Sequence, residues 1–393
     1  MTKLWQAGLD SLLPAIEHYT IGDDQTLDTE LLGYDITATK AHVSMLQSIN
    51  ILSQDETTQV LDELNNLLKQ WQEGSFVVGS EYEDGHTAIE LYLTRQLGDI
   101  GKKVHTGRSR NDQALVMMRL FLKDYLEQID DSLANLADIF KEKSSAAGTQ
   151  AMPGYTHSQK AMPTTVAMWL DSYGQAFEDQ LSYVKATLTI IDQNPLGSAA
   201  GFGVCLPLDR EMTTKQLNFN KTQVNPIYCG LSRGLFEMVS VQSLLPTMTL
   251  VGKFTNDILS YTSQEFNYFK LPRNMTTGSS IMPHKQNYDV FEIARAYSHE
   301  FPSHLLSLQN ISGSVGSGYH RDLQLTKGIV VRALKKVVST LDILALCVSE
   351  LQINKQSLDS AMTKELLTVN KIEQLIKKGV PFRDAYHKVK LNC

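Results

Sequence analysis

The sequence lacks the residue patterns that mark several common classes of protein. Its four cysteines form no CxxC pair and its ten histidines form no HExxH pattern, so we expect reduced thiols, no metal and no organic cofactor. The opening MTKLWQAGLD has no basic region followed by an apolar core, and no stretch approaches the roughly 18 to 20 apolar residues of a membrane span. These absences predict a cytoplasmic protein without a membrane partner.

The sequence also lacks a strong excess of positive or negative charge. The chain carries 36 basic and 43 acidic residues, a net charge of −7, with no long basic run, so nucleic acid is not an expected partner. Its 393 residues are 42% hydrophobic, enough for a large core and for two or three domains. Any cationic site for an anionic ligand must therefore be local.

Alternating strand patterns are almost absent, and helical spacing takes their place. We expect long helical segments at Leu27–Trp71, Leu115–Phe140, Val166–Ile191, Leu231–Phe266 with a kink at Pro246, Tyr288–Leu308 and Val330–Val348. This pattern predicts an all-α protein with an N-terminal helical domain (residues 1–104), a central long-helix bundle (105–350) and a short C-terminal helical domain (351–393). Arg119 is the only polar member of its apolar stripe and needs an acidic or carbonyl partner.

Two stretches interrupt the helices. Glycines and prolines break the pattern between Ala146 and Pro163. The glycine-rich stretch Leu196–Arg210 lacks the GxGxxG order of a phosphate-binding loop and is best interpreted as a structural connection.

The stretch from Thr276 to Asn287, TTGSSIMPHKQN, is the strongest candidate site. Gly278 suggests unusual backbone angles, Ser279 offers a hydroxyl that can act as a base, and Lys285 and Asn287 offer a cation and an amide that stabilise negative charge. A lone GSS tripeptide is more often an ordinary surface loop, so the case rests on the whole string.

Two further motifs each precede a long helix. HTGRSRNDQ (residues 105–113) suits carboxylate binding through Arg108 and Arg110, and is otherwise a helix-capping loop. GYTHSQ (154–159) offers His157 as an acid, a base or an orienting group, although an isolated histidine is usually structural. His86 and Glu90 share one helical face, for which we expect a structural role or a place at the edge of a site.

The string GSSxMPxKxN resembles the signature of the fumarase/aspartase superfamily, and HTGRSRNDQ with YTHxQ resembles the argininosuccinate lyase family within it. The resemblance runs from Leu4-Trp5 to PFRDAYHKV, nearly the whole chain. Two departures stand out. Asn287 is followed by Tyr288 where members commonly have proline, and the chain stops at Cys393 where members usually continue, which suggests a short or truncated C-terminal domain.

The resemblance implies a homotetrameric carbon–nitrogen lyase that splits argininosuccinate into arginine and fumarate, with composite sites built by three subunits. It implies catalytic roles for Ser279 as base, Lys285 as charge stabiliser and His157, which either donates a proton or orients the substrate. The substrate-binding residues that it implies are Ser109, Arg110, Asn111, Thr156, Gln159, Asn287, Tyr319, Gln324 and Lys327. The alternatives are a sister enzyme such as adenylosuccinate lyase and a catalytically silent protein related to the eye-lens crystallins.

Overall fold

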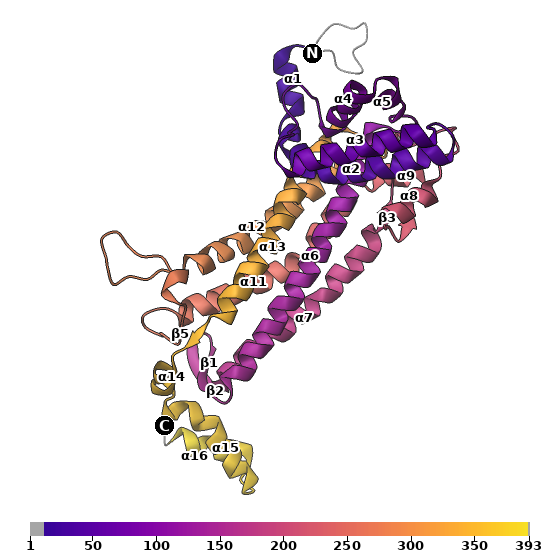
Figure 1. Ribbon diagram of the computed structural model, residues 1–393. Helices are drawn as coiled ribbons and strands as arrows, with labels where there is room; N and C mark the ends of the chain where they lie inside the picture. Colours follow the sequence, from indigo (N-terminus) through magenta and orange to yellow (C-terminus); the bar gives the residue numbers. More distant parts are fainter. Residues whose placement is uncertain (1–11, 392–393) are drawn as a thin grey trace. The chain divides into compact units, whose positions relative to one another are not determined.

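The computed structural model describes residues 12–391 and confirms the all-α prediction (Figure 1). In the described residues, strands are confined to three two-stranded sheets. The chain divides into two compact units. Unit 1 runs up to Gln128 and takes in Tyr183–Ser243 and Pro302–Lys335, and unit 2 contains Ile129–Ser182, Leu244–Phe301 and the chain from Lys336 onward. The division into three domains stays a prediction.

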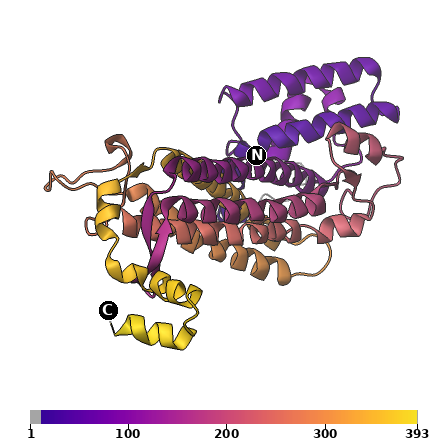
Figure 2. The ribbon, with the colours of Figure 1, turned by 90° about the horizontal axis from the view of Figure 1, so that it is seen from below.

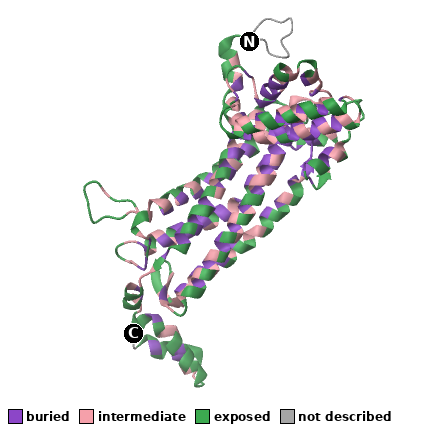
Figure 3. Ribbon diagram, viewed as in Figure 1, coloured by how far each residue is buried: buried purple, intermediate pink, exposed green. Residues whose placement is uncertain are grey.

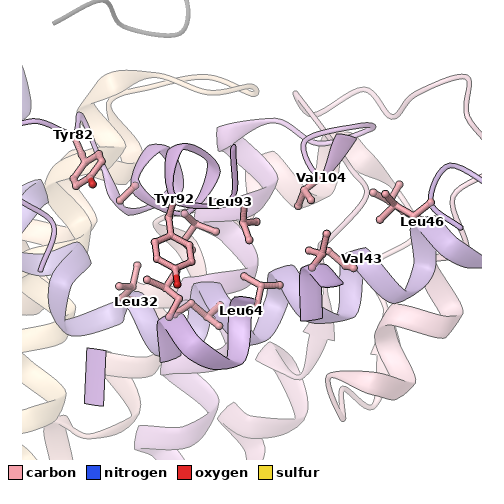
Figure 4. Close-up of a cluster of buried hydrophobic side chains, with 14 of the residues drawn as sticks. Leu32, Val43, Leu46, Leu64, Tyr82, Tyr92, Leu93 and Val104 are labelled. Atoms are coloured by element: carbon pink, nitrogen blue, oxygen red, sulfur yellow. The ribbon is translucent and has the colours of Figure 1, made fainter. Parts of the chain in front are cut away.

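The N-terminal part of unit 1 is helical, as expected, but the run from Leu27 to Trp71 is two helices separated by a turn at Asn50 (φ 60°). The second of them is capped at its start by Ser53, whose side chain forms a reciprocal capping box with Glu56. Side chains from this region, including Leu32, Leu64 and Leu93, meet in one buried cluster (Figure 4). The helices are α1 (Pro14–Ile21), α2 (Asp24–Ser48), α3 (Gln54–Gln72), α4 (Gly85–Leu97) and α5 (Asp99–Lys103).

The first long stripe lies on α6 (Arg110–Ala147), where the residues predicted to be apolar contacts are all buried (Figure 3). Arg119 finds the carbonyl partners that its position requires, because its guanidinium donates to the backbone oxygens of Ile191 and Gln193, both at 3.1 Å. Burial lowers the pKa of Arg119 to about 10, so the side chain stays charged at neutral pH.

Aromatic side chains fill the core of unit 2. Phe140 of α6 packs edge-on against Phe254, with ring centroids 5.0 Å apart, and stacks on Phe177 at 5.7 Å. Phe291 extends this cluster, because the centroid of its ring lies 6.1 Å from that of Phe254. The core therefore joins α6 to α7 (Val166–Ile191), whose bounds match the prediction, and to α11 (Leu245–Tyr261) and α12 (Asp289–Gly313).

The predicted helix Leu231–Phe266 is divided. It consists of α10 (Leu235–Ser243) and α11, which break at Leu244 because Pro246 takes a position in the first turn of a new helix. Taken together, Leu235–Tyr261 is apolar and long enough to cross a membrane, against our expectation, although 56% of its most apolar window is buried inside the protein. A core helix passes the same test, so this segment is weak evidence for a membrane span.

The remaining elements of the described chain are shorter or lie toward its end. They are β3 (Gln193–Asn194), α8 (Arg210–Gln216), β4 (Lys221–Thr222), α9 (Pro226–Leu231), β5 (Phe269–Lys270), η1 (Arg273–Met275), η2 (Arg321–Gln324), α13 (Leu325–Ser349), β6 (Gln352–Ile353), α14 (Lys355–Ala361), η3 (Lys364–Leu367), α15 (Thr368–Lys377) and α16 (Phe382–Lys390).

The break between Ala146 and Pro163 is an antiparallel hairpin that the sequence did not reveal, formed by β1 (Ala151–Thr156) and β2 (Gln159–Thr165). Both strands contain prolines, which obscured their pattern. The hairpin lies beside α14 in unit 2 (Figure 2), where Lys160 donates to the backbone oxygen of Ala361 at 2.6 Å.

Candidate functional site

Five of the predicted ligand-binding residues line one cavity of about 140 Å³ in unit 1: Arg110, Asn111, Tyr319, Gln324 and Lys327. The first two open α6, and the others lie before, in and after η2. The structure therefore brings together two segments that are more than two hundred residues apart in the sequence.

Lys327 is held from both sides by the protein. Its ammonium group bonds to the carboxylate of Asp24 at 2.8 Å and to that of Asp28, which lies one turn further along α2. Burial lowers the pKa of Lys327, but the two carboxylates outweigh burial and the net direction is upward. Burial raises the pKa of Asp24. Lys327 is therefore a fixed cation with two carboxylate partners.

Arg110 is also engaged. It forms ion pairs with Glu83 at 2.9 Å and Asp84 at 3.5 Å. Arg108, which belongs to the same sequence motif, donates to the hydroxyl of Thr39 and does not line this cavity. Only one of the two arginines is thus placed to meet a ligand in this cavity.

The start of α6 is fixed by a buried carboxylate. Asp112 accepts hydrogen bonds from the backbone of Ser109 at 2.8 Å and of Gly197 and Ala199 at 3.0 Å each. Ser109 lies outside the cavity lining, and its hydroxyl accepts from the backbone N–H of Asn111 at 3.3 Å. The glycine-rich stretch therefore acts as a structural connection that holds Arg110 and Asn111 in place.

The sequence missed most of the charged residues in this cavity. Besides the five predicted residues, its wall contains Asp24, Asp28, Glu83, Asp84, Arg233 and Arg321, together with His86, for which a place at the edge of a site was one of the two expected roles. The acidic pairs GDD and YED are the signal that could have found three of them, Asp24, Glu83 and Asp84, but acids near helix starts are common. His86 lies in the wall and pairs with buried Asp35 at 2.6 Å, whereas Glu90 lies 3.5 Å from His105.

His157 lies at the tip of the hairpin in unit 2. The pairing of Thr156 with Gln159 leaves a two-residue turn, in which His157 and Ser158 have φ values of 52° and 60°. Two positive angles define the turn type that suits the twist of antiparallel strands. Next to this turn, a 2.7 Å hydrogen bond between the hydroxyls of Tyr155 and Tyr268 anchors β1. All three predicted residues, Thr156, His157 and Gln159, are exposed.

The loop that carries Ser279 and Lys285 is closed at its base. Thr277 and Asn287 exchange two backbone hydrogen bonds of 3.1 and 2.9 Å. The Thr277 hydroxyl donates to Asp289 at 2.6 Å and accepts from the side-chain amide of Asn287 at 3.3 Å. These contacts, which we call the base clamp, fix Asn287, whereas Lys285 is exposed in the loop.

Ser279 faces backbone donors inside this loop. Its hydroxyl oxygen accepts from the N–H groups of Ile281 at 3.4 Å and Met282 at 3.2 Å. N–H groups directed at an oxygen favour its negatively charged form. Gly278 does not have the left-handed angle suggested by its type, and a Cβ there would meet nothing within 4 Å. The backbone N–H groups, and not an unusual glycine angle, are thus the notable feature of the loop.

The predicted residues fall into two groups. Arg110, Asn111, Tyr319, Gln324 and Lys327 share the cavity of unit 1, whereas the hairpin tip and the Ser279 loop belong to unit 2. Within residues 12–391, no hydrogen bond or ion pair of the structure joins His157 to Ser279 or Lys285.

Comparisons with known proteins agree with the motifs. A family model described as lyase matches residues 19–300. The argininosuccinate lyase of Thermotoga neapolitana is 40% identical over 98% of this chain and 97% of its own length, and that of Phocaeicola vulgatus is 38% identical over 99% and 87%. A solved structure of an EDDS lyase variant with bound fumarate is similar in fold, with a TM-score of 0.80, 21% identity and coverage of 99% of this chain and 77% of that one.

Proposed function

Because this chain belongs to the argininosuccinate lyase family, we propose that it cleaves argininosuccinate reversibly into arginine and fumarate, a carbon–nitrogen lyase reaction of arginine biosynthesis. The structural observation that carries the proposal is the pair of backbone N–H groups directed at the Ser279 hydroxyl. A reaction of this kind needs a base strong enough to remove a proton from carbon, and an alkoxide held by such donors is one.

The proposed reaction proceeds by elimination. The Ser279 oxygen, as alkoxide, takes the proton from the carbon beside a carboxylate of the succinate part, and the electron pair left on carbon spreads into that carboxylate. Lys285 and Asn287 stabilise the added negative charge. The carbon–nitrogen bond then breaks, its electrons leave with the guanidinium nitrogen, and a donor protonates that nitrogen as fumarate forms.

His157 has one of two roles in this scheme: it donates the proton to the departing nitrogen, or it orients the substrate. Its exposed position at the end of a two-residue turn suits a group that one subunit presents to another. Thr156 and Gln159, paired across the same turn, flank the substrate in this proposal. Arg110, Asn111, Tyr319, Gln324 and Lys327 contribute from the cavity of unit 1, and Ser109 contributes from outside its lining, just before α6.

We also propose that four copies assemble so that three subunits share each site. Exposed apolar side chains on the long helices support this assembly, because such residues are best buried against other copies. They include Met168 (67% exposed), Ile190 (45%), Ile293 (52%), Leu306 (58%) and Leu346 (49%). The proposed enzyme is cytoplasmic, with a small-molecule substrate as its partner rather than nucleic acid or a membrane.

One assay separates this function from its rivals. Argininosuccinate, adenylosuccinate, malate and aspartate are offered separately, and fumarate is followed by its ultraviolet absorbance. Release from argininosuccinate is expected, release only from another substrate points to a sister enzyme, and release from none fits a silent crystallin-like protein.

The role of Ser279 is tested with a matched pair of variants. Ser279→Ala should lower turnover at least about a hundredfold, the lower end of what a positioned base contributes. Ser280→Ala removes a neighbouring hydroxyl that makes no hydrogen bond within the described chain, and it should keep most of its turnover. Equal losses in both variants, or none in Ser279→Ala, would remove Ser279 from the mechanism.

A further inference from the structure

The ladder of the hairpin is interrupted below its tip (residues 155–160), which carries His157. The register shifts between Pro153 and Tyr155, and only two residue pairs lie beyond the shift. An irregularity of this kind disrupts the ladder locally. The pair just before it is Pro153 opposite Pro163, and neither residue has a backbone N–H to give to the ladder. The base of the hairpin therefore restrains the tip only weakly.

Packing does not hold the tip either. Residues 156–160 are all exposed. Tyr155 and three of these residues line an open cavity of about 1030 Å³, whose other walls include β6, α14 and the segment between α11 and β5. The tip therefore has no packed neighbour on the side of this cavity, and contacts at particular points must hold it.

Two such contacts tie the tip to other elements of unit 2. On β1, the hydroxyl of Tyr155 shares a 2.7 Å hydrogen bond with that of Tyr268, which stands just before β5. On β2, the ammonium group of Lys160 donates to the backbone oxygen of Ala361, at the end of α14, at 2.6 Å. Because Tyr155 and Lys160 are partners across the ladder, each strand is tied once, close to His157.

Tyr268 provides the firmer of the two ties. Its side chain is only 3% exposed, and its ring lies edge-on to that of Phe266, with centroids 5.3 Å apart, and 5.7 Å from that of Tyr261. Lys160 is exposed, so water competes for its hydrogen bond. The aromatic packing of unit 2 thus fixes the Tyr268 hydroxyl, and this hydroxyl fixes Tyr155.

We propose that Tyr268 is a positioning residue for His157. Through Tyr155 it sets the place at which the hairpin presents the imidazole, and the contact between Lys160 and Ala361 is the second tie. This assignment rests on the proposed function, which gives His157 its part in the reaction. Tyr268 itself touches no reacting atom in that scheme, and no sequence motif indicated it.

The first test measures the tip without any use of activity. Backbone hydrogen exchange, followed by mass spectrometry on a peptide that spans residues 155–160, reports how often the tip opens. In Tyr268→Phe this exchange should be about threefold to tenfold faster, which is the effect of losing one hydrogen bond of ordinary net strength. Exchange in α7 should stay at the wild-type rate.

Tyr261→Phe is the matched control. It removes a hydroxyl from the same aromatic cluster, but one that makes no hydrogen bond within residues 12–391, so exchange at the tip should not change. Tyr155→Phe removes the bond to Tyr268 from its other end and should have the same effect as Tyr268→Phe. It therefore provides the result if Tyr268→Phe does not fold.

The second test measures activity. In Tyr268→Phe, kcat/KM for argininosuccinate should fall about threefold to tenfold, because the imidazole is held in its working position for a smaller share of the time. Tyr261→Phe should keep the wild-type value. Fumarate release over a range of substrate concentrations gives both values.

A mixing experiment shows whether Tyr268 acts through the His157 of its own chain. When His157→Asn and Ser279→Ala chains refold together, the restored sites take His157 from the Ser279→Ala chain. Tyr268→Phe added to that chain should lower the restored activity about threefold to tenfold. The same change in the His157→Asn chain should leave it unaltered. The reverse pattern would assign Tyr268 to the Ser279 loop, and equal losses would make its role generally structural; either result overturns the proposal.

The outcomes separate the assignment from the function. If exchange at the tip is the same in Tyr268→Phe, or in Tyr155→Phe, as in Tyr261→Phe, the tie is wrong whether or not fumarate is released. If the tip loosens only in Tyr268→Phe and Tyr155→Phe but fumarate release stays at the wild-type rate, the positioning role is wrong and the proposed function stands. If the wild type releases no fumarate from argininosuccinate, the proposed function fails and the role of Tyr268 in it fails as well, even where exchange demonstrates the tie.

Discussion

The base clamp of the Ser279 loop gives a prediction whose size follows from its contacts. Thr277→Val replaces the hydroxyl by a methyl group of similar volume, which removes the donation to Asp289 at 2.6 Å and the acceptance from Asn287 at 3.3 Å. A hydrogen bond to a charged group is worth about 1.5 to 3 kcal/mol, and the lower end applies because both partners are partly exposed. A loss of about 1.5 kcal/mol corresponds to about a tenfold change in an equilibrium constant.

We therefore expect kcat/KM for argininosuccinate to fall about tenfold in Thr277→Val, because Asn287 is no longer held where it meets the developing charge. The measurement is the initial rate of fumarate release over a range of substrate concentrations. Thr277→Ser keeps the hydroxyl and should recover most of the rate. The melting temperature should hardly change, since the loop is exposed and contributes little to the core.

The neighbouring residue supplies the control. Within the part of the chain that the structure describes, the hydroxyl of Thr276 bonds only to the backbone oxygen of Arg273, at 3.0 Å, so Thr276→Val should leave the rate nearly intact. The reasoning is refuted if Thr276→Val and Thr277→Val lose equal activity, if serine at position 277 restores nothing, or if Thr277→Val works at the full rate.

Other tests address the hairpin, a buried ion pair and the assembly. Ser158→Gly should raise the melting temperature, because glycine avoids the left-handed cost of about 1 to 2 kcal/mol and loses only about 0.5 to 1 kcal/mol of chain entropy; Ser145→Gly, inside α6, should lower it. Burial lowers the pKa of His86, but the carboxylate of Asp35 raises it by more, so the net shift is upward. The stabilisation by this pair is therefore complete below about pH 6.5 and is lost as the pH rises through the raised pKa. Chemical denaturation should accordingly show that Asp35→Asn is most destabilising at acidic pH, and a loss independent of pH would contradict this. Refolding an equal mixture of inactive His157→Asn and Ser279→Ala chains should restore roughly a quarter of the sites, since each of two donors is correct about half the time; mixed tetramers that remain inactive would exclude shared sites.

Periodicity predicted the long helices well because their apolar stripes are long. The bounds of α7 agree with the prediction to the residue, and the stripe on α6 is buried throughout. Periodicity could not locate the hairpin around His157, because Pro153 and Pro163 stand in its strands and read as chain breakers. Local signals also could not decide that Pro246 begins a helix instead of bending one, since both positions tolerate proline.

For the candidate site, the sequence indicated some of the residues but not their partners. The motifs indicated Arg110, Asn111 and Lys327, and the structure places all three at one cavity. The carboxylates that engage Arg110 and Lys327 come from other parts of the chain, and nothing in a single sequence records which acid meets which base. Arg233 was missed for the same reason, because no sequence motif indicates that it lines this cavity.

The two-residue turn at His157 also limits how the chain can change in length. Side chains alternate between the two faces of a strand, so adding or deleting one residue between Thr156 and Gln159 would reverse the orientation of every later residue relative to its partner. Substitutions at the tip leave that register intact, whereas insertions do not. Engineering of this hairpin is therefore free to alter its chemistry but not its number of residues.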